Sequence, residues 1–503
     1  MLSNALLAID FYKVDHRRQY PAGTTEIYSN FTPRYVKKCH SILPDFDNQI
    51  VVFGIQAFIQ EFLINHFHYG FFARNCHEVI GQYKDLIQTA LGIEDFDVSH
   101  LYELHDLGYL PIRIKAINEG FRVPIGIPVL SIVNTLPQFF WLTNYLETIL
   151  SASLWKPMTS ATIAFEFKRL LTKYARLTGG DESFVPFQAH DFSFRGMSGL
   201  EDAMMSGAAH LTSFYGTDCV PSIDLLNRLY DASATVSCVG TSVPATEHSV
   251  MCCDGKDGEF ATIKRLITEV YPEGIVSVVS DSYNLWHTLT VYLPSLYKEI
   301  NERQGKLVIR PDSGNPVDII CGDINAPQGT PANTGALRLL WDLFGGRIND
   351  RGYRELNPKI GLIYGDAITV ERAALMLKIM EEMKFASTNI VFGVGSYTYQ
   401  YVTRDTFGFA MKATSAVING ERKAIFKDPQ TASKNNPKKS ARGLLHVGLD
   451  MENGRFTLAD DVSEAFEKEG YLETVFEDGI LINGVDLAQI RHNLNVELDR
   501  VSE

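Results

Sequence analysis

Residues 306–316, KLVIRPDSGNP, place a cation and an acid directly behind a short apolar run. The run itself, residues 307–309, is typical of a buried parallel strand, so Arg310 and Asp312 would lie at its carboxyl end. Arginine presents a rigid fork of donors that suits phosphate oxygens, and aspartate offers a carboxylate to a cation or a hydroxyl. The alternative is a plain strand-to-helix turn in which the acid caps the following helix.

Several other apolar runs between residues 183 and 400 also end in polar or small residues. Strands that alternate with helices build a parallel sheet, and in barrel folds the carboxyl ends of the strands gather at one mouth. The sequence therefore predicts a single active face. That face would collect Arg195, Asp218, His248, Asp281, Arg310, Asp312, Gly365, Asp366, Gly393 and Gly395.

The residue types at this predicted face indicate the class of ligand. Two arginines, several acids and the glycine turn GVGSYT (393–398) favour a phosphorylated sugar with vicinal hydroxyls. Mg²⁺ suits such a ligand, because it prefers one or two carboxylates together with substrate phosphates. Phe192 and Phe194 beside Arg195 offer a surface for a planar ring. The sequence has no G-x-S-x-G elbow, Walker lysine or G-x-G-x-x-G turn after a strand.

Composition argues against several classes of protein. The chain has 503 residues, enough for two or three cores, and a net charge of −14 without a basic tail, which argues against a nucleic-acid-binding surface. No apolar run reaches the roughly 18–20 residues of a membrane span, and Asp10 interrupts the N-terminal apolar run before it reaches signal-peptide length. The seven cysteines form no CxxC pattern, so we expect reduced thiols, no zinc site and a cytoplasmic protein.

Three segments are predicted to position the active face. Residues 1–180 combine helical periodicity, with two helices over 141–179, and a run of alternating residues over 110–135 that is typical of short antiparallel strands. We interpret this segment as an α+β scaffold domain. Residues 181–400 form the predicted α/β barrel-like catalytic domain. Residues 401–503 end in a helical pattern and are expected to complete the scaffold domain.

A set of motifs in fixed order carries a resemblance over nearly the whole chain. The motifs are HDFSFRGMSG (190–199), GTDCV (216–220), SVPATEHS (242–249), VSDSYN (279–284), IRPDSGNP (309–316), YGDAI (364–368) and FGVGS (392–396), with FYKVDHRRQYP near the start and FKDP (426–429). Together they resemble the nicotinamide phosphoribosyltransferase family.

The resemblance implies a type II phosphoribosyltransferase fold: an irregular (β/α) barrel-like domain plus an α+β domain built from N- and C-terminal segments. It also implies a homodimer with active sites at the interface. The expected reaction is that of a pentosyltransferase in NAD salvage. Nicotinamide and phosphoribosyl pyrophosphate give nicotinamide mononucleotide and pyrophosphate, with Mg²⁺, and ATP as a co-substrate phosphorylates a histidine.

Residue roles follow from the resemblance alone. Phe192 and Tyr12 of the second subunit would sandwich the pyridine ring, Asp218 would accept a hydrogen bond from the carboxamide, and Arg195 would lie against the ring. The substrate site would further include His190, Ser242, Val243 and Ser277. Gly365 and Asp366 would hold the ribose hydroxyls. The 5′-phosphate would be bound by Gly395 and Ser396, and by three cations of the second subunit, Arg34, Arg404 and Lys412.

The resemblance assigns the chemical step to a second group. His248 would be phosphorylated, with Glu247 orienting it. Asp312, with Asp281 close by, would stabilise the developing ribosyl cation, and Arg310 would bind phosphate. A pre-placed carboxylate suits such charge, because ribosyl transfer passes through an oxocarbenium-like state.

Two departures from the family pattern and three alternative functions accompany this reading. Tyr397 stands in a turn that in relatives is a run of glycines, and Ala410 stands where a serine is expected to contact phosphate. The alternatives are a nicotinate-using sister enzyme, a phosphosugar lyase or isomerase on the same barrel, and a non-enzymatic extracellular signalling protein. Asp218 favours nicotinamide, since a carboxylate repels nicotinate and accepts from an amide.

Overall fold

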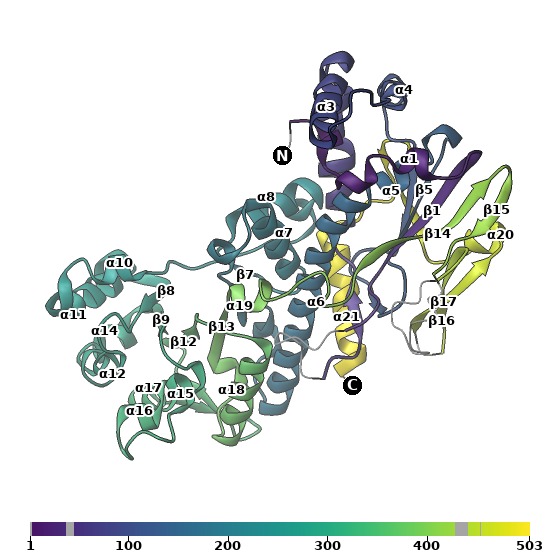
Figure 1. Ribbon diagram of the computed structural model, residues 1–503. Coiled ribbons are helices and arrows are strands. Elements are labelled where there is room, and N and C mark those ends of the chain that lie inside the picture. The colour runs from purple at the N-terminus through teal and green to yellow at the C-terminus, as the bar shows by residue number, and fades with distance from the viewer. Residues whose placement is uncertain (1–2, 37–44, 428–440, 453, 503) are drawn as a thin grey trace.

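The computed structural model describes residues 3–36, 45–427, 441–452 and 454–502. Within them, two sheets of different character organise the chain, with a long central helix between them (Figure 1). One sheet is wholly parallel and the other wholly antiparallel. The predicted FKDP motif lies partly, and Cys39 wholly, outside these residues. The six described cysteines are free thiols.

The parallel sheet carries the strand ends that the sequence singles out. Its strands, in spatial order, are β7 (Gly216–Thr217), β6 (Ala189–Asp191), β13 (Ile390–Val394), β12 (Ile360–Tyr364), β9 (Gln304–Arg310) and β8 (Glu273–Val279). Helices follow or separate them along the chain: α7 (Leu200–Leu211), α8 (Val220–Leu229), α10 (His248–Met251), α11 (Gly255–Arg265), α15 (Pro316–Cys321), α17 (Ala336–Phe344), α18 (Val370–Glu382) and α19 (Ser396–Tyr399).

One further segment, residues 241–246, joins the two edges of this sheet. Thr241 bridges Gly216 of β7, and Ala245 bridges Ser277 of β8, both in parallel orientation. The Thr246 amide donates to the Ser277 carbonyl oxygen at 2.9 Å. Seven strand-like segments therefore follow one another around a ring in chain order, which confirms the predicted irregular α/β barrel-like domain.

The antiparallel sheet is built from both halves of the sequence. Its order is β15 (Glu421–Ala424), β14 (Ala410–Ile418), β1 (Thr24–Thr32), β5 (Leu130–Asn134), β3 (Ile112–Ala116), β18 (Glu473–Glu477) and β19 (Ile480–Leu481). Phe31 of β1 stacks on Phe409 at 5.2 Å between ring centroids, so the distant segments share one core. Around this sheet lie α2 (Ile55–Phe58), α3 (Cys76–Leu91), α4 (Ser99–Leu107) and the hairpin β16 (Leu444–Asp450) and β17 (Arg455–Val462).

Helix α6 (Glu147–Thr178) links the two sheets (Figure 1). The two helices expected over 141–179 are present as the single turn α5 (Leu142–Tyr145) and the 32-residue α6. A proline inside a helix usually breaks it, yet α6 continues through Pro157. The ring of Pro157 packs on Gly54, where an added Cβ would lie 2.8 Å from Pro157 Cγ. No described helix is both long and apolar enough to cross a membrane.

A separate core joins α6 to the C-terminal helix α21 (Leu487–Ser502), which lies beside it (Figure 1). The buried side chains of α21 pack with those of α6, α7 and α8; they include Phe165, Leu211, Leu226, Ile490 and Leu494. The helical pattern predicted near the C-terminus is confirmed. It packs against helices of the barrel as well as against α6.

Candidate active site

The carboxyl ends of the parallel strands bring the predicted residues together at one mouth. The Arg310 guanidinium at the end of β9 lies 5.9 Å from the ring centroid of Phe192, which follows β6. The His190 ring lies 4.7 Å from the same Phe192 ring. A Cβ placed on Gly365, after β12, would lie 3.0 Å from Asp312 Oδ1. The predicted convergence of separate strand ends is therefore found in the structure.

At one side of the mouth, Asp218 is held by two donors. Its Oδ1 atom lies 2.8 Å from His190 Nε2 and 2.7 Å from the Ser242 hydroxyl. Burial alone would raise the pKa of Asp218, but the hydrogen bonds from His190 and Ser242, with the charge of Arg310, hold that pKa below its usual value. Both hydrogen bonds end on Oδ1, so they leave Oδ2 for a ligand donor.

The Phe192 ring packs closely against Gly393 and Gly365. An added Cβ at Gly393 would lie 2.5 Å from the Phe192 ring and 2.7 Å from the Cα of Gly365, and one at Gly365 would lie 3.5 Å from the same ring. Real Cβ contacts are never that short, so a side chain at Gly393 would displace the ring. The glycines predicted to hold ribose or phosphate thus also have a packing role that the sequence did not indicate.

At the carboxyl end of β8, Asp281 organises the strand end of β9. Its Oδ2 accepts a hydrogen bond from the Asp312 amide at 2.9 Å and another from the Ser313 hydroxyl. Its Oδ1 is buried and accepts no hydrogen bond among the described residues, while His248 Nε2 lies 3.6 Å away. Glu247, predicted to orient His248, instead accepts a hydrogen bond from Ser249.

Neighbouring charged groups act on the carboxyl group of Asp312. Burial raises the pKa of Asp312, and the neighbouring charges of Asp281 and Asp366 raise it further, against the opposing effect of Arg310 and His248. Arg310 is fixed by a hydrogen bond from Nη2 to the Thr246 carbonyl at 2.5 Å, and its buried Nε has no partner among the described residues. Arg310 and Asp312 are therefore placed for a polar ligand.

The glycine turn after β13 leads directly into α19. Tyr397 stacks on Tyr401 at 4.7 Å between centroids, with the Arg372 guanidinium 5.6 Å from its ring, so its side chain is accommodated by neighbours. The first residue of α19 lies against the Arg195 loop, because a Cβ on Gly196 would lie 2.7 Å from that of Ser396. Ala410 pairs with Thr32 across the antiparallel sheet.

Ser277 and Val243 belong to the joining strands rather than to a strand end. Ser277 lies within β8, where its amide donates to the Pro244 carbonyl at 2.9 Å, and its buried hydroxyl has no partner among the described residues. Val243 follows Ser242 in the segment that closes the ring.

The remaining predicted residues form a separate group on the antiparallel sheet and the N-terminal arm. Burial lowers the pKa of Lys412; the carboxylate of Glu147 opposes this effect and the charges of Arg34, Lys13 and Arg404 add to it. These four cations, named here the cationic cluster, therefore lie near one another. Tyr12 is 62% exposed, with Lys13 Nζ 5.1 Å from its ring. Among the described residues, no hydrogen bond, ion pair or ring contact joins this cluster to Phe192, Asp312 or Ser396.

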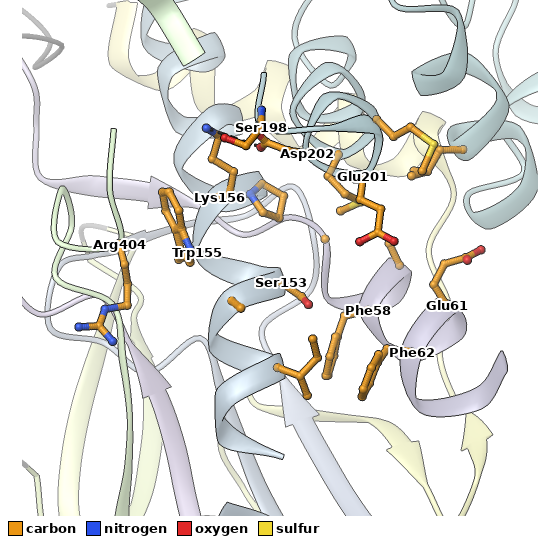
Figure 2. A pocket seen from close by; sticks show the side chains of 18 of the residues that line it. Phe58, Glu61, Phe62, Ser153, Trp155, Lys156, Ser198, Glu201, Asp202 and Arg404 are labelled. Atoms are coloured by element: carbon orange, nitrogen blue, oxygen red, sulfur yellow. Dashed lines mark hydrogen bonds and ion pairs between the residues drawn. The ribbon is translucent and has the colours of Figure 1, made fainter. Parts of the chain in front are cut away.

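A cavity of about 800 Å³ lies between α6, α7 and the helices after residue 54. Figure 2 shows Lys156, Ser198 and Asp202 at one end and Phe58 and Phe62 at the other. Its lining includes Arg404 but none of the strand-end residues, so we do not assign the chemistry to it.

Three residues that the sequence reasoning missed support the mouth. The Thr246 hydroxyl accepts from the Val279 amide at 2.9 Å while its carbonyl accepts from Arg310. The Tyr364 hydroxyl donates to the Gly314 carbonyl at 2.8 Å, and Ser313 donates to Asp281. All three adjoin predicted residues in sequence, and only this adjacency could have indicated them.

Known proteins resemble the chain over these same regions. Residues 187–480 match the model of the nicotinate phosphoribosyltransferase family, and residues 4–114 match the nicotinamide phosphoribosyltransferase N-terminal domain. The nicotinamide phosphoribosyltransferase of Acinetobacter baylyi is 52% identical over 99% of this chain and 98% of its own. The proteins of that name from Mycoplasma pneumoniae and Xanthomonas campestris are 35% and 33% identical, over 85% and 97% of this chain and 92% and 98% of their own.

Solved structures agree on the fold. The nicotinate-nucleotide pyrophosphorylase of Pyrococcus furiosus superposes with a TM-score of 0.57 at 14% identity, covering 100% of this chain and 97% of that one. The human nicotinic acid phosphoribosyltransferase superposes with a TM-score of 0.52 at 13% identity, covering 98% of this chain and 93% of that one. At these identities the likeness concerns the fold alone.

Proposed function

This chain belongs to the nicotinamide phosphoribosyltransferases, within the nicotinate phosphoribosyltransferase family, and we propose that it transfers the phosphoribosyl group of phosphoribosyl pyrophosphate to nicotinamide. The ring nitrogen of nicotinamide forms a bond to C1 of the ribose. The bond from C1 to the pyrophosphate oxygen breaks, and its electron pair leaves with pyrophosphate. The products are nicotinamide mononucleotide, whose ring is now a pyridinium, and pyrophosphate.

The observation that carries the choice of base is the environment of Asp218. Hydrogen bonds from His190 and Ser242 keep its pKa low, so it is ionised at neutral pH. An ionised carboxylate with a free oxygen accepts a hydrogen bond from the carboxamide of nicotinamide. It repels the carboxylate of nicotinate, and such charge repulsion is an effective way to exclude a wrong partner.

The acidic side of the mouth supports the chemical step. The Asp312 amide donates a hydrogen bond to the Asp281 carboxylate. This contact would hold the Asp312 carboxylate near the ribose carbon on which positive charge develops. Arg310 is fixed on Thr246 and offers its remaining donors to phosphate oxygens. Ionised Asp312 interacts more favourably with the positive charge that develops on the ribose ring than with the uncharged ring of the bound substrate, and this difference accelerates transfer.

Mg²⁺ fits the residues present. The buried Oδ1 of Asp281 has no hydrogen-bond partner among the described residues, and the charge of Asp366 is close enough to Asp312 to raise the pKa of Asp312. Asp281 and Asp312 would hold the ion together with substrate phosphates, in keeping with its preference for few protein ligands. When bound, Mg²⁺ would neutralise charge on the leaving pyrophosphate.

His248 is the proposed site of ATP-dependent phosphorylation. It lies 3.6 Å from Asp281 and is half exposed at the mouth, which leaves its ring accessible. A ring nitrogen would form a bond to the γ-phosphorus of ATP while the bond to the ADP oxygen breaks. We assign the neighbouring carboxylate role to Asp281, because Glu247 bonds to Ser249.

A homodimer would bring the cationic cluster and Tyr12 to the mouth of the second subunit. Within one chain no hydrogen bond, ion pair or ring contact joins these groups to the described strand-end residues, although the resemblance assigns them roles around the ring and the 5′-phosphate. The exposure of Tyr12 supports its use by another chain. The free thiols of the described cysteines support a reducing, cytoplasmic location.

One assay tests the proposal. Purified protein with phosphoribosyl pyrophosphate and Mg²⁺ should form nicotinamide mononucleotide from nicotinamide, faster with ATP, and should not use nicotinate at a comparable rate. Faster turnover of nicotinate would contradict the role of Asp218. Turnover of neither base would contradict the proposed function itself.

A further inference from the structure

Arg491 of the C-terminal helix α21 is a buried cation, 8% exposed, surrounded by backbone carbonyls. Its Nε and Nη2 donate to the Leu211 carbonyl at 3.0 and 2.7 Å, Nη2 also donates to that of Val239 at 2.7 Å, and Nη1 donates to that of Cys238 at 2.6 Å. The guanidinium carbon lies 4.6 Å from the Tyr215 ring centroid. None of the ion pairs of the described residues includes Arg491, so its guanidinium interacts with backbone carbonyls and an aromatic ring instead of a carboxylate.

Burial costs a charged group free energy unless it is fully hydrogen-bonded. Burial lowers the pKa of Arg491 to about 10, which still leaves the guanidinium charged at neutral pH. A guanidinium that holds three carbonyls is a strong fixed clamp, because its planar fork is preorganised and each bond is charge-assisted.

The clamped segments are those that carry the base end of the mouth. Tyr215 precedes β7, which leads to Asp218, and Cys238 and Val239 precede Ser242 by only a few residues. The two segments also pair with each other. The Thr241 amide donates to the Tyr215 carbonyl at 2.7 Å, and the Thr217 amide donates to that of Thr241 at 2.9 Å.

This part of the ring has little support of its own. β7 has only two residues, and the neighbouring segment is joined to it by a single bridge between Gly216 and Thr241. The hydrogen bond from Ser242 to Asp218 depends on how these two short segments are placed. Arg491 contacts residues that lead into both of them, Tyr215 before β7 and Cys238 and Val239 before residue 241.

We infer that Arg491 is a positioning residue for base recognition, which holds the segments bearing Asp218 and Ser242 at their hydrogen-bonding distance. It touches neither substrate nor Asp218, and acts through the backbone carbonyls of Leu211 and residues 238–239 and through the ring of Tyr215. This inference rests on the proposed function of the site. It assigns part of the selection between an amide and a carboxylate base to the C-terminal helix.

The test compares Arg491→Lys with a matched control, Arg303→Lys. Arg303 is equally buried, at 6% exposure, and donates to the carbonyls of Tyr271 and Glu273. It lies at the amino end of β8, away from the mouth. Lysine keeps the charge in both variants but cannot reproduce the fork, so both should lower the thermal unfolding temperature.

Only Arg491→Lys should change base recognition. We expect the KM for nicotinamide to rise about tenfold, which corresponds to the loss of a hydrogen bond. The KM for phosphoribosyl pyrophosphate should stay within about twofold, and the preference for nicotinamide over nicotinate should fall. Arg303→Lys should leave both KM values within about twofold, because Arg303 stabilises the fold without positioning a substrate-binding residue.

Equal kinetic changes in the two variants, or an unchanged nicotinamide KM in Arg491→Lys, would overturn the inference. If Arg491→Lys does not fold, Tyr215→Leu decides, because it removes the ring beneath the guanidinium and should raise the nicotinamide KM a few-fold. An unchanged KM in that variant would equally overturn it. Failure of the wild-type protein to use nicotinamide would instead reject the proposed function.

Discussion

Nε2 of His190 lies 2.8 Å from Oδ1 of Asp218, and this contact fixes which oxygen of the carboxylate is left for the base. Replacing the carboxylate by an amide should therefore disturb selection as well as binding. We expect Asp218→Asn to lower kcat/KM for nicotinamide by roughly 10- to 100-fold, the typical contribution of a hydrogen bond to a charged group. The ratio of kcat/KM for nicotinamide to that for nicotinate should fall as well. Steady-state kinetics with both bases measure this. Asp224→Asn, a surface acid paired with Arg228, is the control; equal behaviour of the two variants would contradict the assignment.

Because Phe192 packs closely against Gly393 and Gly365, adding one methyl group at Gly393 should have a large effect on stability. Gly393→Ala would force the Phe192 ring and Gly365 to move, so we expect a loss of about 1–3 kcal/mol in the free energy of unfolding, as for other overpacked sites, and weaker nicotinamide binding. Gly81→Ala on α3 meets nothing within 4 Å and should gain about 0.5–1 kcal/mol. Chemical denaturation measures both. A neutral Gly393→Ala would show that the ring is not held as described.

The raised pKa of Asp312 predicts the direction of a pH shift. If transfer needs the ionised form, activity falls as the pH drops through this raised pKa. Asp281 contributes to the increase, so Asp281→Asn should lower the pKa of Asp312 and move the acidic limb of the kcat profile to lower pH, whatever the loss in rate. The profiles should be measured without ATP, so that His248 phosphorylation does not enter. Asp342 is an exposed acid paired with Arg338, and Asp342→Asn should leave the acidic limb of the profile unchanged. A shift of that limb to higher pH in Asp281→Asn would contradict the prediction.

The position of His248 predicts a separable role for ATP. His248→Ala should abolish stimulation by ATP while slow transfer persists, because the histidine is not among the groups proposed to touch the ribose or the base. Product formation with and without ATP gives the ratio directly. His446→Ala removes a half-buried histidine that stacks on Phe466 of the scaffold and should keep full stimulation. Equal stimulation in His248→Ala would remove it from the mechanism.

Shared sites can be tested by mixing two inactive proteins. Asp312→Ala removes a group of the mouth, and Arg404→Ala removes a member of the cationic cluster. Refolded together in equal amounts, they should regain about a quarter of wild-type activity, because about half of the dimers are mixed and each mixed dimer has one complete site. Each protein refolded alone is the control. Mixed dimers without activity would place Arg404 in the site of its own chain.

The strand ends were predictable because a short apolar run followed by Arg-Pro-Asp or Gly-Asp is a local signal. Residues 241–246 also lie within one of the predicted runs, but their closure of the ring was not predictable, since they join the sheet only through single bridges. Pairings such as Asp281 with His248, or Arg491 with Cys238, depend on how separate segments pack, which spacing in one sequence does not encode. The continuation of α6 through Pro157 depends on packing in the same way, because Gly54 makes the necessary room.

Pairing of Thr32 in β1 with Ala410 in β14 has a consequence for synthesis of the protein. At about 5–20 residues per second, a ribosome needs roughly 20–80 s after completing β1 to deliver its partner. Meanwhile β1 can pair with β5, but its other edge stays open, and open strand edges attract other chains. The nascent chain therefore spends most of its translation with an unfinished sheet, a state in which chaperones are expected to determine the yield.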